Sequence, residues 1–81
     1  MAQLLVGTNY QNLDFSALTS LLLLLGFEER IRGRHHIFSR TGVLEIINLQ
    51  PAPGNTVKPY QAKQVRALLL QYRAGLHLDT F

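Results

Sequence analysis

The chain has 81 residues, a length that fits one domain, and its 47% hydrophobic and 16% charged residues are typical of a globular protein rather than a disordered one. It contains no cysteine, which excludes disulfides and thiolate metal ligands, and its formal net charge of +3 is compatible with a nucleic-acid partner without requiring one. Because the longest apolar run is only Leu21–Leu25 and the first basic residue is Arg30, we expect no membrane segment and no signal peptide, and therefore a cytoplasmic protein.

A first helix is predicted over residues 15–25. Residues 1–13 form a lead-in, in which Gln3–Val6 could make one helical turn. Asp14 is a favourable N-cap, and Gly26 is a plausible residue just past the end of the helix. The apolar residues between them recur at helical spacing: Phe15, Leu18, Leu22 and Leu25.

Three strands are predicted to follow, over residues 27–32, 35–40 and 43–49. Gly33-Arg34 separates the first two, and a two-residue Gly-X connection suits a β-hairpin. Thr41-Gly42 separates the second from the third, whose β-branched and apolar residues favour a strand. The pattern therefore predicts a three-stranded antiparallel meander.

A second helix is predicted over residues 59–73, after a loop that is rich in Pro, Gly and Asn at 51–55. Pro59 suits the first turn of a helix, and apolar residues repeat at helical spacing after it. Residues 76–81 are expected to form a frayed tail. The resulting order is α-β-β-β-α, an α+β two-layer sandwich in which two helices cover one face of a three-stranded antiparallel sheet.

Two adjacent histidines, His35 and His36, lie in the most cationic segment of the chain, between Arg30 and Arg40. Histidine exchanges protons near neutral pH and arginine pairs with phosphate, so the segment suggests chemistry on a phosphodiester. Successive strand residues point to opposite faces, so the two histidines should not converge on one phosphate or one metal ion. From the residues alone, a surface histidine without a role remains the favoured reading of His35.

Four stretches of the chain resemble the HicA-type mRNA interferases, the toxins of bacterial type II toxin–antitoxin systems. These stretches are Leu25-Gly26-Phe27, the segment from Gly33 through His35-His36 to Phe38, Ile46–Pro51 and Lys58–Gln61. The resemblance covers about residues 4–73, so the chain reads as one HicA-like domain over 1–81 with a tail at 74–81.

The resemblance implies a fold similar to double-stranded-RNA-binding domains and metal-independent cleavage of mRNA in a stress response, without a cofactor. It also implies neutralisation by a cognate HicB-type antitoxin. The family's usual motif is Gly-Ser-His, and its histidine corresponds by position to His35, which would be the catalytic base. Arg34 stands where serine is usual. An alternative is a non-catalytic RNA-binding module in which Arg34 has impaired catalysis, and a third hypothesis is a protein-binding adaptor.

Arg30, Arg32, Arg34 and Lys58 are the candidate RNA-binding residues, because cationic side chains contact phosphate groups. The alternative for the arginines is a solvated strand face that Glu28 and Glu29 partly balance. The remaining proton-transfer group could be His36, Tyr60 or water. For His36 a structural role is favoured, and His77, in the tail, is expected to be inert.

The leucine run cannot face the core entirely, because five helical residues sweep more than a full turn. With the stripe that begins at Phe15 buried, Leu23 and Leu24 should lie on the opposite side together with Ser20, and Leu21 at the margin of the stripe. A pair of exposed leucines often marks a partner surface, here for the antitoxin or for a second copy in a homodimer. The alternative is a pair of surface leucines that the fold tolerates.

Overall fold

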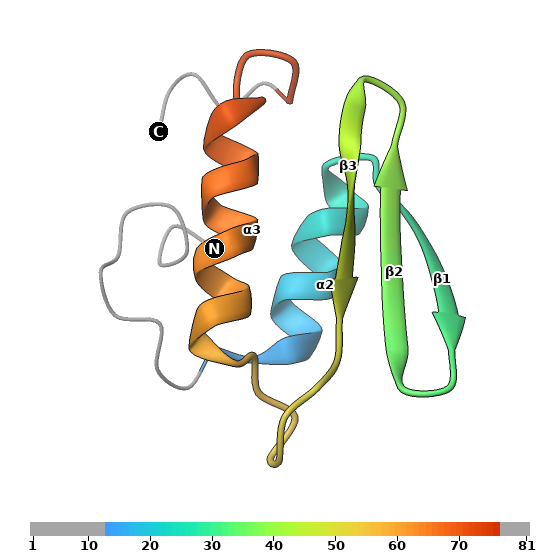
Figure 1. Ribbon diagram of the computed structural model, residues 1–81, viewed down its shortest axis with the longest axis vertical. Helices are drawn as coiled ribbons and strands as arrows, with labels where there is room; N and C mark the ends of the chain where they lie inside the picture. The colour runs from blue at the N-terminus through green and yellow to red at the C-terminus, as the bar shows by residue number, and fades with distance from the viewer. Residues whose placement is uncertain (1–12, 77–81) are drawn as a thin grey trace.

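The computed structural model describes residues 13–76, and within them the predicted α-β-β-β-α order is confirmed. The elements are α2 (Phe15–Leu24), β1 (Glu28–Arg32), β2 (His35–Arg40), β3 (Val43–Leu49) and α3 (Pro59–Gln71). Both helices lie on the same side of the sheet, so the molecule has one helical layer and one sheet layer (Figure 1). The helical turn expected at residues 3–6 and the inert His77 lie outside the described residues.

The sheet is an antiparallel meander in the order β1-β2-β3, as predicted. The first hairpin closes with Arg32 opposite His35, and Gly33 in its two-residue turn has a φ of 60°. This positive φ at the first turn position is what a type II′ turn requires, and glycine adopts it without steric cost. The second hairpin closes through Thr41-Gly42, and its register shifts between Phe38 and Arg40.

Both ends of α2 are fixed by specific hydrogen bonds. The Asp14 side chain accepts from the backbone N–H of Ala17 at 2.9 Å, which confirms the predicted N-cap. At the other end Gly26 has a φ of 92°, and the N–H groups of Gly26 and Phe27 donate back into the last turn, as in a Schellman motif. Arg40 Nε donates to the carbonyl oxygen of Leu25 at 2.8 Å, so a cation also meets the negative end of the helix.

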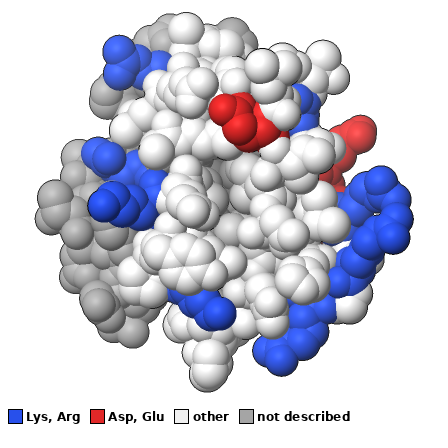
Figure 2. Space-filling model, viewed as in Figure 1, with Lys and Arg blue, Asp and Glu red and all other residues white. Residues whose placement is uncertain are grey.

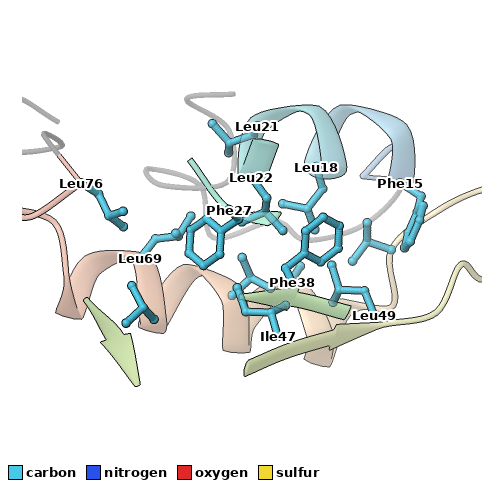
Figure 3. Close-up of a cluster of buried hydrophobic side chains, with 14 residues drawn as sticks. Phe15, Leu18, Leu21, Leu22, Phe27, Phe38, Ile47, Leu49, Leu69 and Leu76 are labelled. Carbon is cyan, nitrogen blue, oxygen red and sulfur yellow. The ribbon is translucent and has the colours of Figure 1, made fainter. Parts of the chain in front are cut away.

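The hydrophobic core lies between the helices and one face of the sheet, where α2, α3, β2 and β3 each contribute side chains (Figure 3). Phe38, Leu22, Leu49 and Leu69 are its largest fully buried residues, and each contributes about 1.5–3 kcal/mol through removal of its side chain from water. Leu21 is also buried, whereas it was expected at the margin of the stripe.

Leu76 corrects the expectation of a frayed tail that begins at residue 76. Its side chain is 4% exposed and belongs to the core, and its N–H donates to the carbonyl oxygen of Tyr72 at 3.0 Å. The helix itself ends at Gln71 rather than at 73, with Tyr72 as its C-cap. The chain therefore returns to the core after the helix ends, which a helical periodicity does not predict.

The loop between β3 and α3 is bound to the start of α2. The Phe15 N–H donates to the Asn55 carbonyl oxygen at 2.9 Å, and the Val57 N–H donates to the Leu13 carbonyl oxygen at the same distance. These bonds fix where the chain enters α3. Within residues 13–76 there is no helix of the length and apolarity that a membrane crossing requires.

Candidate functional site

The two adjacent histidines lie on opposite faces of the sheet, as strand alternation predicts. Phe38 and its β3 partner Ile47 point to the helices, and His36 shares their face. His35 lies on the other face, which no described helix covers, and its side chain is exposed. We call these the covered face and the open face of the sheet.

His36 is anchored on the covered face. Its Nδ1 lies 2.7 Å from Glu29 Oε2, and both side chains are only about one-fifth exposed, at 21% and 20%. The imidazole ring also meets the Phe15 ring edge-on, with the centroids 4.9 Å apart. A partly buried ring with two such partners is fixed in its orientation and helps to hold β1 and α2 against β2. We therefore interpret His36 as a structural residue.

His35 is oriented by one contact on the open face. Its Nδ1 lies 3.2 Å from Asn48 Oδ1, a side chain of β3. The Asn48 Oδ1 atom only accepts hydrogen bonds, so Nδ1 is the donor in this contact, and in the neutral ring the lone pair is then on Nε2. Among the described residues no group bonds to Nε2. The ring therefore offers solvent a fixed proton acceptor.

Two of the predicted phosphate-binding arginines lie beside His35 on the open face. Arg32 is its direct cross-strand neighbour, and Arg30 lies two residues along β1, on the same face. Directly opposite side chains of an antiparallel pair are within reach of one another. Arg34 is in the hairpin turn and is exposed. Lys and Arg side chains gather along the right-hand edge of Figure 2, where Figure 1 places β1.

Lys58 occupies a different layer of the molecule. It is the exposed N-cap of α3, and it makes no side-chain capping bond. The start of α3 and the β1–β2 turn lie at the same end of the molecule (Figure 1). The structure thus brings Arg30 and Arg32 together with His35, and it places Lys58 at the same end but in the helical layer.

Asn48 is the site residue that the sequence analysis did not single out. It lies within the Ile46–Pro51 segment, but no role was assigned to it. Strand alternation, counted from the two-residue turn at Thr41-Gly42, puts residue 48 on the face of residue 35. Strand alternation in the sequence was therefore sufficient to predict that Asn48 and His35 share a face of the sheet.

The predicted exposure of Leu23 and Leu24 is confirmed. Their exposed fractions are 48% and 73%, and Ser20 is exposed one turn earlier on α2. Their role as a partner surface stays a prediction, because exposure alone is compatible with tolerated surface leucines.

Two further features bear on the chemistry of the open face. Among residues 13–76 no three His, Asp or Glu side chains gather as a metal site would require. A depression of about 490 Å³ lies near the other end of β2, lined by Gly26, Glu28, Ser39, Arg40 and Thr41. Arg40 donates hydrogen bonds there to the carbonyl oxygens of Leu25 and Thr41. None of the residues that line this depression belongs to the His35 site.

The chain was compared with protein-family models, with curated proteins and with solved structures, and none of them matches it.

Proposed function

We propose that the chain is a metal-independent endoribonuclease of the HicA type, a type II toxin that cleaves mRNA in the cytoplasm and is neutralised by a HicB-type antitoxin. The observation that best supports a nuclease is the orientation of His35 by Asn48, on an exposed face that also carries Arg30 and Arg32. The resemblance described above supplies the biological setting.

RNA carries its own nucleophile, the 2′-hydroxyl beside each phosphate, so the protein needs to supply only proton transfer and stabilisation of the developing charge. In the proposed reaction His35 Nε2 takes the proton of a 2′-hydroxyl, and the 2′-oxygen attacks the adjacent phosphorus. The bond from phosphorus to the 5′-oxygen breaks, and the leaving oxygen takes a proton. The products are a 2′,3′-cyclic phosphate and a 5′-hydroxyl. A positioned base of this kind contributes roughly 10²–10⁴-fold in rate.

The arginines would stabilise the charge that develops on the phosphoryl oxygens. Arg32 is adjacent to His35, and the exposed Arg34 extends from the same hairpin. Fixed cations near the developing charge lower the barrier because they need no reorganisation during the reaction. His36 is on the covered face and bonded to Glu29, which leaves Tyr60 or water to protonate the leaving oxygen.

Cleavage of labelled RNA by the purified protein, in the presence of a chelator, tests the proposal. We expect cleavage products with 2′,3′-cyclic phosphate ends and no cleavage at a nucleotide whose 2′-hydroxyl is replaced by hydrogen. His35→Ala should reduce the rate by roughly 10²–10⁴-fold, because the base is lost. Induced expression of the wild-type chain in bacteria should arrest growth, and His35→Ala should not.

Ser39→Ala is the matched control, because Ser39 is an exposed residue of the same strand and lies away from His35. It should cleave like the wild type. The assignment of His35 is wrong if His35→Ala still cuts RNA at a near wild-type rate.

The second candidate is the RNA-binding module without catalysis. It is favoured by Arg34, a large exposed cation in the turn where the family motif has a small hydroxyl. A wild-type chain that retards RNA in a gel and never cuts it would establish this alternative.

A further inference from the structure

The two edges of the sheet differ in their protection against pairing with another chain. In β1 four of the five residues are charged, in the sequence EERIR. In β3 only Glu45 is charged among seven residues, and Leu44 and Ile46 are 93% and 66% exposed. Charged side chains on an edge strand oppose the addition of a further strand. Only the β1 edge has this protection.

A groove runs along the unprotected edge, between β3 and α3. Its volume is about 90 Å³, and it is lined by Ile46–Leu49 of β3 and by Gln61, Gln64, Val65 and Leu68 of α3. Gln61 is 8% exposed, and among the described residues its Oε1 has no hydrogen-bond partner. A buried acceptor without a donor is costly, so the groove favours an occupant that brings N–H groups.

At the Leu44 end of this edge, a side chain of the same molecule already accepts the backbone N–H. The Leu44 N–H donates to the Tyr72 hydroxyl at 3.4 Å, and that hydroxyl donates to a Glu45 carboxylate oxygen. The hydrogen bond to Glu45 raises the pKa of Tyr72, so the hydroxyl stays protonated. Among the described residues β3 pairs with β2 alone, so from Ile46 onward its outer edge is without a neighbouring strand.

We propose that the β3 edge binds a second copy of this chain, with the two β3 strands antiparallel about a two-fold axis at Ile46. In this register each Ile46 faces its own counterpart, and Glu45 faces Ile47 of the second copy. An axis at Glu45 would instead place two carboxylates opposite one another, which is destabilising. The strand is thus complementary to itself in this register, and pairing at Leu44 requires its N–H to give up the bond to the Tyr72 hydroxyl.

The distribution of charge favours the same surface. Each chain carries a formal net charge of +3, so two copies repel unless their contact avoids the arginines. The α3 residues that line the groove form an uncharged stripe, Gln61, Gln64 and Leu68. Figure 2 shows largely uncharged surface across the middle of the view, with most of the cationic side chains at its margins.

Sedimentation of the full chain over a range of concentrations tests the proposal without reference to RNA cleavage. The wild type should pass from 9.2 kDa to twice that mass as its concentration rises. Ile46→Lys places two cations face to face at the axis and should weaken the association at least about tenfold. Because Ile46 is mostly exposed, the variant should keep the fold, which circular dichroism checks.

Cross-linking locates the contact, because the natural chain has no cysteine. Ile46→Cys should form a covalent dimer with a short bismaleimide, whereas Leu24→Cys, on the exposed side of α2, should not. Three results would overturn the proposal: a monomeric mass at every concentration, unchanged association of Ile46→Lys, or cross-linking of Leu24→Cys in preference to Ile46→Cys. The first would leave the edge to an extended segment of another protein, and the last would move the dimer contact to α2.

Discussion

The covered and open faces of the sheet use the same residue type in opposite ways. His36 is partly buried against Phe15 and bonded to Glu29, so it links β1, β2 and α2. His35, one position earlier, is exposed, and its ring has one side-chain hydrogen bond among the described residues, to Asn48. A histidine with two structural partners is constrained by the fold, while one held by a single amide is available for chemistry. One step along a strand therefore separates a structural residue from a candidate catalytic one.

The largest expected effect is on the covered face. Phe38→Ala should lower the free energy of unfolding by about 3–5 kcal/mol, because it removes a fully buried ring and leaves a cavity. Leu44→Ala, at a 93% exposed position of β3 outside the core, should change it by no more than about 0.5 kcal/mol. Urea unfolding measures both. Similar losses at the two positions would contradict the assignment of the faces.

Replacing each histidine in turn by alanine tests the difference between the covered and open faces. His36→Ala should cost about 1–2 kcal/mol of unfolding free energy, because Glu29 loses its partner and Phe15 its ring contact. His35→Ala should cost no more than about 0.5 kcal/mol, because the side chain is exposed. Thermal or urea unfolding decides this, and a larger loss for His35→Ala would reverse the roles given to the two residues.

Asn48 tests how the open face is organised. Asn48→Ala should lower the rate of RNA cleavage about tenfold, equivalent to about 1.4 kcal/mol, because the His35 ring loses its fixed orientation. The Michaelis constant for RNA should change little, since Asn48 orients the base and does not hold the substrate. Asn48→Asp retains an acceptor oxygen and should recover part of the rate. No recovery, or a loss confined to the Michaelis constant, would remove the positioning role.

The arginines of the open face should act through phosphate. RNA affinity should fall with salt, and Arg32→Ala should reduce the slope of log K against log salt by about 0.7, the value for one single-strand phosphate contact. Arg73→Ala is a control, because Arg73 is exposed just after α3, away from the open face. It should leave the slope unchanged. Affinity that does not respond to salt would show that the open face does not bind RNA.

Arg34→Ser gives the smallest expected effect. If Arg34 replaces the family's serine without loss, cleavage by the serine variant should differ by less than tenfold, or about 1.4 kcal/mol. The turn itself should not change, because Gly33 retains the positive φ. A cleavage rate that appears only in Arg34→Ser would instead mean that arginine has silenced the site.

The sequence was sufficient for the elements and their order. Asp14, Gly26 and the glycine turns marked boundaries that the structure reproduces within two residues, because these local signals depend on the backbone alone. It could not say which histidine lies on the covered face, since Ile37 and Phe38 make both faces of β2 partly apolar. That choice depends on where the helices pack, which periodicity within one strand does not contain.

The contact between His35 and Asn48 shows a second limit. Regular pairing from the Thr41-Gly42 turn would place Asn48 directly opposite His35. The register shift between Phe38 and Arg40 places it opposite Ile37 instead, so it reaches His35 diagonally. The shared face was predictable from alternation, but the pairing was not. Leu76 escaped prediction for a related reason, because a single apolar residue after a helix has no period.

The bonds between the β3–α3 loop and the start of α2 have a consequence for synthesis of the chain. Phe15 and Leu13 emerge early from the ribosome, but their partners Asn55 and Val57 emerge much later. Until that loop has emerged, α2 has neither these bonds nor the α3 side chains against which it packs. A short helix without tertiary partners is marginal in water. The open face is therefore assembled only after the loop and α3 have left the ribosome, and a nascent chain that stops earlier carries His35 on an unsupported hairpin.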